Sequence, residues 1–154
     1  MEMADIRFEN GTKGYVRCYC NVAGVTFDNR QKYLKGIKKI AEKKDSDLQI
    51  VLEREPENTY DANAVKVIAR WQLSEEYKNT KREKYTPMGN DFEKRVCIGY
   101  LPKEVAKRVA PVMDSGFANK NWVIVDSFLI ETYRGTTCVS LKLAYRPDGA
   151  RKSA

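Results

Sequence analysis

The chain of 154 residues contains no histidine. Without it, the chain alone cannot form Ser-His-Asp or Cys-His nucleophilic systems, or His-ligated zinc and iron sites. Binding without catalysis and a metal site made only of carboxylates remain open. A run of about 18 apolar residues, as a membrane span requires, is also missing, and the N-terminus lacks the apolar stretch of a signal peptide. We therefore expect a cytoplasmic protein, or a nuclear one if the source is a eukaryote, with no membrane partner.

Cysteine is too scarce for a disulfide scaffold, because the chain has only four, Cys18, Cys20, Cys97 and Cys138. The first two form a C-x-C pair, which is not the C-x-x-C of a redox or zinc motif, and no second pair follows. On a strand, Cys18 and Cys20 share one face with apolar neighbours, and a free cysteine is commonly buried. The pattern predicts buried small side chains, and neither a metal nor a cofactor.

Basic residues exceed acidic ones, with 28 Lys and Arg against 21 Asp and Glu, which gives a net charge of +7. The excess is concentrated: residues 30–44 hold seven basic side chains and one acidic, whereas residues 45–61 hold one basic and six acidic. Phosphate binding favours clustered Lys and Arg, because each contact releases condensed counterions. Segment 30–44 is therefore a candidate nucleic-acid surface. The alternative is an ordinary solvated helix face.

Hydrophobic periodicity predicts six strands and two helices. The strands are expected at residues 15–22, 48–52, 64–71, 96–101, 121–131 and 137–146. One helix follows Asp28 or Asn29, whose side chain can cap it, and carries an apolar stripe that includes Tyr33. The other begins with Pro102 at its first position, and Pro111 is expected to kink or split it.

Strands and helices without regular βαβ alternation indicate an α+β class with an antiparallel sheet or small barrel. Segment 72–95 is polar, charge-dense and too long for an ordinary connection, so we interpret it as an insertion within a single domain of residues 14–146. Residues 147–154 are polar and are expected to form a flexible tail. We expect the protein to be a monomer.

The densest polar cluster lies between two predicted strands, in residues 54–65. A loop tyrosine such as Tyr60 can stack on a base, and Asn58 and Asp61 can bond a sugar hydroxyl or a base edge. Two alternatives stand beside this interpretation. Asn and Asp also bond their own backbone in a tight hairpin turn, and Glu55, Glu57 and Asp61 are close enough in sequence to hold Mg²⁺.

The order and spacing of several motifs resemble a known family. The motifs are Arg54-Glu-Pro-Glu-Asn-Thr-Tyr-Asp-Ala-Asn-Ala-Val-Lys-Val67, Ile98-Gly-Tyr-Leu-Pro-Lys-Glu-Val-Ala106 and Ala110-Pro-Val-Met-Asp-Ser-Gly116. Upstream, Val22-Ala-Gly-Val-Thr-Phe27 and Arg30-Gln31 fit the family's opening strand and helix. Together, over residues 14–145, they are similar to the HIRAN domain. This module occurs alone in bacteria and phage, and at the N-terminus of SWI/SNF-type DNA-repair ATPases.

The resemblance implies an OB-like small β-barrel of about six mostly antiparallel strands with two helices. It also implies a non-enzymatic module that binds single-stranded DNA at a free 3′-hydroxyl end, in DNA repair or replication-fork processing. A separate DNA-processing ATPase or helicase is the candidate protein partner. The residues expected to bind DNA are Phe27, Arg30, Asn58, Tyr60, Asp61, Tyr100 and Lys103.

Each motif position carries an implied role. Tyr60 and Phe27 are implied to stack on the terminal base. Asp61, with Asn58 beside it, is implied to accept a hydrogen bond from the 3′-hydroxyl, and Lys103 to contact a phosphate. A carboxylate at that place would disfavour a 3′-phosphate by charge repulsion.

Several positions depart from the eukaryotic form of the module. Thr26 stands at an Arg position, Asp28 replaces a second aromatic next to Phe27, and Tyr100 stands at a His position. A further aromatic from the C-terminal strands has no motif to identify it. Its candidates are Trp122 and Phe128, and packing in the core is the alternative for both.

Two other functions stay open on the residues alone. One is a Mg²⁺-dependent nucleic-acid phosphodiesterase that uses Glu55, Glu57 and Asp61, although no second carboxylate cluster completes a two-metal site. The other is a protein-interaction adaptor that uses the insertion at 72–95 as its contact.

Overall fold

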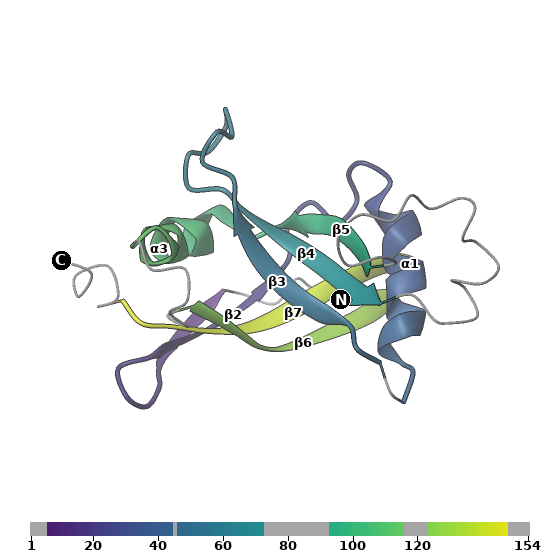
Figure 1. The fold of residues 1–154 in the computed structure, drawn as a ribbon, viewed down its shortest axis with the longest axis horizontal. Helices are drawn as coiled ribbons and strands as arrows, with labels where there is room; N and C mark the ends of the chain where they lie inside the picture. The colour runs from purple at the N-terminus through teal and green to yellow at the C-terminus, as the bar shows by residue number, and fades with distance from the viewer. Residues whose placement is uncertain (1–5, 45, 73–92, 116–122, 148–154) are drawn as a thin grey trace.

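The structure is a computed structural model that describes residues 6–44, 46–72, 93–115 and 123–147. In chain order the described elements are β1 (Arg7–Asn10), β2 (Val16–Asn21), α1 (Arg30–Ala41), β3 (Gln49–Arg54), β4 (Val65–Gln72), β5 (Glu93–Tyr100), α3 (Lys103–Met113), β6 (Val123–Tyr133) and β7 (Thr136–Tyr145). Figure 1 shows their arrangement.

The described strands form two antiparallel sheets, ordered β1-β2-β7-β6 and β3-β4-β5. In β7, every second residue is buried, namely Thr137, Val139, Leu141, Leu143 and Tyr145. This period of two is what a strand with one face on the core requires. The register of β2 against β7 places Cys18 opposite Leu143 and Cys20 opposite Leu141. Both cysteines are buried, which confirms the prediction made for them.

The α+β class is confirmed. The described part of the chain has seven strands instead of six, because β1 is a short edge strand with too few residues to show a period in the sequence. The expected barrel is not closed, since the hydrogen-bonded ladders of the described strands divide into two sheets. This arrangement is compatible with a small OB-like β fold.

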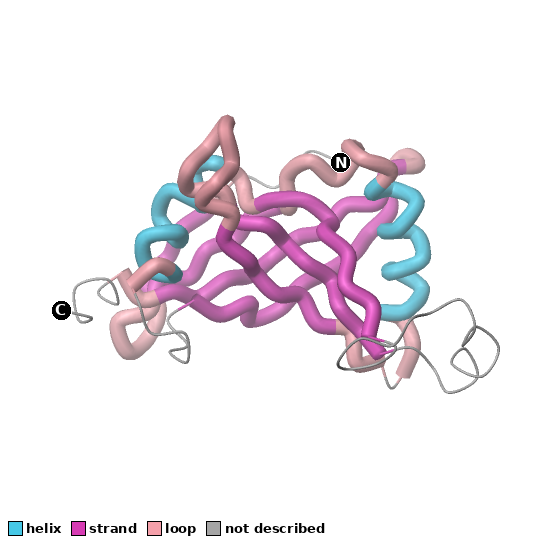
Figure 2. The backbone as a smooth tube through the Cα atoms, turned by 45° about the horizontal axis from the view of Figure 1, so that its top comes forward, coloured by secondary structure: helices cyan, strands magenta, loops and turns pink. Residues whose placement is uncertain are grey.

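The two described helices lie at opposite ends of the strand layers, α1 at one end and α3 at the other (Figures 1 and 2). Helix α1 buries Leu34 and Ile37, and α3 buries Val105 and Val109. These side chains join the inward faces of the strands in one core. Each fully buried side chain of this size stabilises the fold by roughly 1.5–3 kcal/mol.

The helix ends differ from the predictions in detail. Asn29 is the N-cap of α1 but makes no side-chain capping bond, because Asp28 and Asn29 both adopt positive φ values, 54° and 60°. Pro102 is the N-cap of α3 instead of its first residue, and α3 continues through Pro111 unsplit. Tyr33 is 46% exposed, so it does not belong to the buried stripe of α1.

None of the described helices is long and apolar enough to cross a bilayer. The ends of the predicted insertion at 72–95 belong to β4 and β5, and its residues 73–92 lie outside the described part of the chain. Trp122 and all but the first residue of the predicted tail at 147–154 also lie outside it.

Candidate nucleic-acid interface

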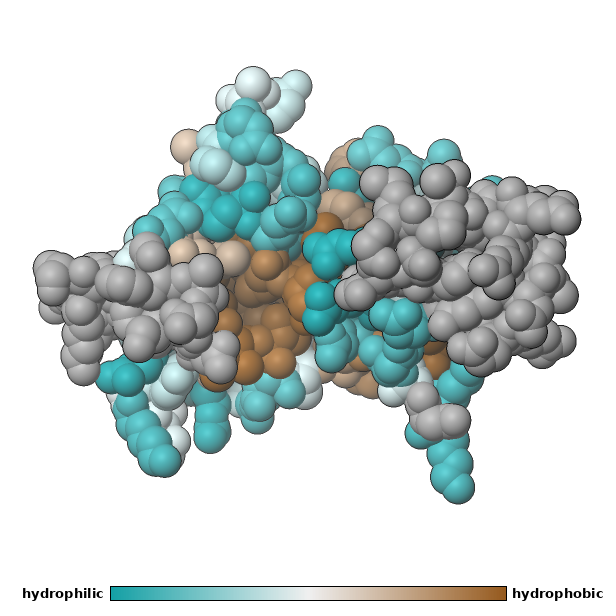
Figure 3. Space-filling model, in the orientation of Figure 1, coloured by the Kyte–Doolittle hydropathy of each residue, from teal (hydrophilic) through white to brown (hydrophobic). Residues whose placement is uncertain are grey.

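The loop that joins β3 to β4, residues 55–64, projects from the body of the molecule (Figure 1). Its surface is hydrophilic, as Figure 3 shows at the top of the molecule. Tyr60 lies in this loop and is 94% exposed, which is unusual for so large a ring. Because the ring is exposed on a projecting loop, a partner can contact both faces of the ring.

The side chain of Asn58 fixes the shape of this loop. Its Oδ1 accepts hydrogen bonds from the backbone N–H of Tyr60 at 2.8 Å and of Asp61 at 3.0 Å. Asp61 continues the pattern, because its Oδ1 accepts from the backbone N–H of Asn63 at 2.9 Å. These Asx-type bonds replace the backbone bonds that a tight turn lacks. They confirm the hairpin-turn interpretation, and they hold Tyr60 outward without using its ring.

Arg54 anchors the base of the loop. Its guanidinium donates to the carbonyl oxygens of Ala64 at 2.6 Å and Ala62 at 2.9 Å. It also forms a bidentate pair with Asp114, with N–O distances of 2.9 and 3.1 Å. Asp114 is the C-cap of α3, so the loop is tied to a helix that is distant in sequence. A planar fork of two bonds fixes both distance and orientation.

Glu55 connects the loop to two strands. Its Oε1 accepts from the Asn58 amide at 2.7 Å and from the Tyr100 hydroxyl at 2.9 Å, and its Oε2 pairs with Lys66 at 3.1 Å. The Asn58 bond, followed by those from Tyr100 and Lys66, lowers the pKa of Glu55. Burial and the bond to Glu55 raise the pKa of Tyr100, and the pairing with Glu55 raises the pKa of Lys66. The network is therefore most stable with Glu55 ionised.

Acidification is expected to weaken this network through Glu55. Its pKa in the folded protein lies below the unfolded value near 4.3, so its contribution is complete above that value and is lost as the pH falls through the folded pKa. Melting temperatures between pH 7 and pH 3 should fall more steeply for the wild-type protein than for Glu55→Gln. The glutamine keeps an acceptor for Asn58 and does not titrate. Parallel curves would contradict a stabilising role for the Glu55 charge.

The loop between β2 and α1 carries Phe27, whose ring is 66% exposed. Arg30, by contrast, is buried: its guanidinium donates to the Gly24 carbonyl at 2.8 Å, pairs with Asp28 at 3.6 Å and lies 5.6 Å from the centroid of the Tyr100 ring. It holds the two ends of the loop together from inside. The structure thus gives Arg30 internal partners, whereas Phe27 faces outward.

Gln31 holds the same loop against β7. Its amide nitrogen donates to the carbonyls of Val25 at 2.9 Å and Thr137 at 2.8 Å, and its Oε1 accepts from the Thr137 N–H at 2.7 Å. These three bonds leave little freedom to the turn that carries Phe27. The backbone that carries Phe27 is therefore held by bonds within the fold.

Tyr100 brings the two loops together. Its backbone pairs with that of Ala23 through bonds of 2.7 and 2.9 Å, and its hydroxyl donates to Glu55 in the other loop. Lys103, three residues further, is exposed in the first turn of α3. Six predicted site residues thus lie on connected elements around the end of β5, although they are distant in sequence. They are Phe27, Asn58, Tyr60, Asp61, Tyr100 and Lys103.

The carboxylates do not form a metal site. Among the described residues, no group of three or more His, Cys, Asp or Glu side chains has an arrangement that could hold a metal ion. Glu55 is instead engaged by Asn58, Tyr100 and Lys66. The proposed Mg²⁺ site of Glu55, Glu57 and Asp61 is therefore not formed.

Of the two C-terminal aromatic candidates, only Phe128 lies in the described part of the chain. It is partly buried and packs against the core.

The sequence interpretation missed three other contributors. Arg54 and Lys66 stabilise the loop, and Gly99 lets β5 approach Ala23 closely. Arg54 opens a recognised motif, and Gly99 lies within the Ile98–Ala106 motif. Their roles depend on contacts between segments that no periodicity reveals.

Comparison with known proteins gives one positive result. The family model of the HIRAN domain matches residues 15–127, which include both loops, Tyr100 and Lys103. No curated protein matches the chain, and no solved structure does. The family predicted from the motifs is confirmed.

Proposed function

Because the chain belongs to the HIRAN domain family, whose members are nucleic-acid-binding modules, we propose that it binds single-stranded DNA and recognises a free 3′-hydroxyl end. It acts as a binding module and not as an enzyme. Its place is in DNA repair or replication-fork processing, where a separate ATPase or helicase supplies the motor.

The observation that carries this proposal is the pairing of Tyr60 with Asp61 on a loop held by Asn58. Tyr60 offers a face to the terminal base, and base stacking on an aromatic tolerates any sequence. The Oδ1 atom of Asp61 accepts a hydrogen bond from the backbone N–H of Asn63. Within the described part of the chain, its Oδ2 atom makes no hydrogen bond. In this proposal that oxygen accepts a hydrogen bond from the 3′-hydroxyl. Phe27 supplies a second stacking surface from the neighbouring loop.

The remaining residues contribute charge and position. Lys103 is exposed at the start of α3 and contacts a phosphate as a compact cation. Tyr100 positions the loop through Glu55, and Arg30 positions Phe27 from inside its loop. In this proposal Arg30 acts through Phe27 and makes no direct contact with DNA.

A change at the 3′ end should reveal the role of Asp61. Two oligonucleotides of one sequence, one ending in a 3′-hydroxyl and the other in a 3′-phosphate, are compared by fluorescence anisotropy. We expect tighter binding of the hydroxyl end, because two negative groups would otherwise meet at Asp61. A charge-assisted hydrogen bond contributes about 1.5–3 kcal/mol, so the difference is expected to be roughly tenfold or more.

Asp61→Asn is the matched variant, since an amide oxygen can still accept from the Asn63 N–H while the charge is gone. It should bind both ends with similar affinity. Equal affinity of the wild-type protein for the two ends would refute end recognition. General binding to single strands would then be the surviving function.

A further inference from the structure

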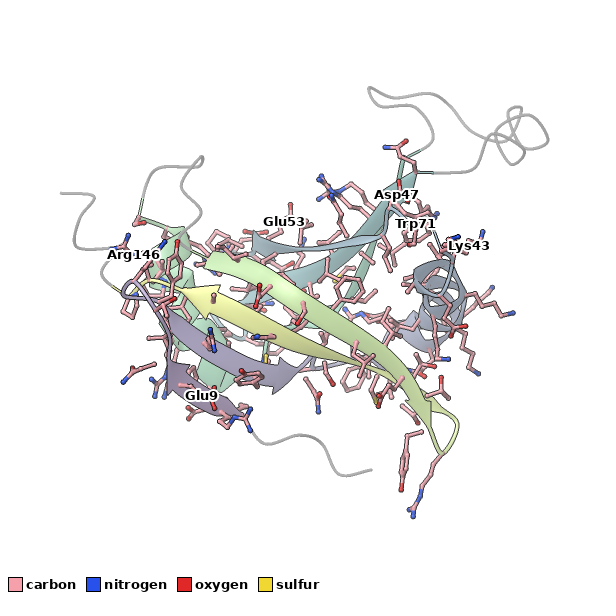
Figure 4. All side chains as sticks on the ribbon, turned by 90° about the horizontal axis from the view of Figure 1, so that it is seen from below. Glu9, Lys43, Asp47, Glu53, Trp71 and Arg146 are labelled. Atoms are coloured by element: carbon pink, nitrogen blue, oxygen red, sulfur yellow. The ribbon has the colours of Figure 1, made fainter. Side chains whose placement is uncertain are left out.

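Helix α1 presents a row of lysines on the side that faces away from the core. Leu34, Ile37 and Ala41 pack toward the strands. At 3.6 residues per turn, Lys32, Lys35 and Lys39 fall on the opposite side of the helix, and Lys43 extends their line just beyond its end. We name Lys32, Lys35, Lys39 and Lys43 the lysine row. Figure 4 shows Lys43 at this outer side of α1.

The lysine row is not neutralised by neighbouring acids. Within the described residues, its four members are exposed and form no salt bridge. The single acidic residue of the segment, Glu42, is paired with Lys38 at 2.8 Å. Two acidic residues of segment 45–61 are also engaged, Glu55 by Lys66 and Asp47 by the backbone of Gln72. Tertiary structure thus leaves the four members of the row available, whereas Arg30 is buried and Lys38 is paired.

The row begins next to the loop of Phe27. Helix α1 starts at Arg30, three residues after that ring, and runs away from it along the end of the sheets (Figure 1). Successive lysines are about 4.5–6 Å apart along the helix axis, from a rise of 1.5 Å per residue. Nothing bulky interrupts the row, because Gly36 lies beside it with open space around it.

We propose that the lysine row binds the sugar-phosphate backbone of the single strand that leads to the 3′ end. This inference rests on the proposed function for the direction of the strand: its last nucleotide lies at Tyr60 and Asp61, it passes Phe27, and its preceding phosphates follow α1. The partner is recognised by its regularly spaced negative charges and not by its bases. Tyr33, half exposed beside the row, offers one further ring to a base.

The test uses a double variant, Lys35→Gln with Lys39→Gln, and two thymidine probes that end in a 3′-hydroxyl. One probe is a trinucleotide, which is long enough for the end site only, and the other has about 16 nucleotides. Each lost contact should lower the log–log salt slope by about 0.7, so the variant's slope for the long probe should be smaller by about 1.4. At 0.1 M salt this corresponds to roughly 25-fold weaker binding. Binding of the trinucleotide should not change.

The matched control is Lys13→Gln with Arg17→Gln, which removes the same charge from two exposed residues, one in the turn between β1 and β2 and one in β2. It should bind the long probe nearly as the wild-type protein does. Glutamine is as good a helix former as lysine, and unchanged melting temperatures would verify that both variants fold.

Three outcomes would overturn the proposal: an unchanged slope and affinity for the long probe, an equal loss in the control variant, or an equal loss for the trinucleotide. The proposed function and the lysine-row proposal can be refuted separately. If the wild-type protein shows no preference for a 3′-hydroxyl while the Lys35/Lys39 variant still loses affinity for the long probe, end recognition is refuted and the lysine row is supported.

Discussion

Replacing Tyr60 with alanine is expected to weaken binding of single-stranded DNA by about 1–3 kcal/mol, or roughly 5- to 150-fold, without lowering the melting temperature. The ring is 94% exposed, and the hydrogen bonds that shape its loop come from the Asn58 side chain and the backbone of Tyr60. The variant therefore loses the stacking surface and keeps the loop. Anisotropy with a 3′-hydroxyl oligonucleotide and a thermal melt measure the two quantities separately.

Tyr133→Ala is the control for this prediction. Tyr133 is also exposed, at 40%, but it lies at the end of β6, beside the turn to β7. Its loss should not affect binding. Tyr60→Trp should retain or improve affinity, because the larger ring still stacks. If Tyr60→Ala binds DNA normally, the projecting loop is only a capped turn and the base contacts lie elsewhere.

Replacing Gly99 with alanine is expected to destabilise the protein by about 3 kcal/mol, which combines backbone strain of about 1–3 kcal/mol with a steric clash of similar size. Gly99 has a φ of 153° and lies where the pairing of β4 with β5 shifts register. A Cβ there would collide with the carbonyl oxygen of Ala23 and with the Val22 side chain. For a chain of this size the melting temperature should fall by roughly 6–12 °C.

The same substitution is expected to impair DNA binding, because the Ala23 carbonyl that would be displaced accepts a bond from Tyr100. Gly36→Ala is the matched control. Gly36 lies in α1 with no atom within 4 Å of an added Cβ, so alanine should raise stability by about 0.5–1 kcal/mol. A Gly99→Ala protein that melts with the wild type would show that β5 can move away from Ala23 without cost.

Local patterns predicted most of the elements. The alternation in β7 and the apolar stripe of α3 are visible in the sequence because burial of one face requires a fixed period. The α+β class follows from their order. Where a prediction from local patterns failed, a contact between distant segments had a larger effect on the local structure than the residue pattern did. Gln31 bonds the backbone of Thr137 in β7 and so holds the turn before α1, and the expected cap at Asp28 or Asn29 is not used.

In the candidate site, too, motifs predicted some features, and contacts between distant segments determined others. The motif around Tyr60 and Asp61 identifies the loop, and Asn58 is the kind of residue that shapes such a turn. Yet the sequence interpretation considered Glu55 for a metal, whereas its partners Tyr100 and Lys66 make it the link between loop and sheet. Arg30, which was expected among the DNA-binding residues, is buried and donates a hydrogen bond within its own loop. Neither outcome follows from spacing, since both depend on which strands lie side by side.

The amino-acid sequence was sufficient to predict the family, the α+β class, the concentration of positive charge in residues 30–44 and the polar loop at residues 54–65. Each of these is a property of neighbouring residues or of a fixed period along the chain. Packing of the folded chain was needed to show that Lys38 and Glu42 pair with each other and that Tyr100 joins the loops of Phe27 and Tyr60. Hydrogen bonds and ion pairs form only at about 3 Å, so the bonds of Tyr100 and Gln31 depend on contacts between segments that lie 45 to 106 residues apart in the chain.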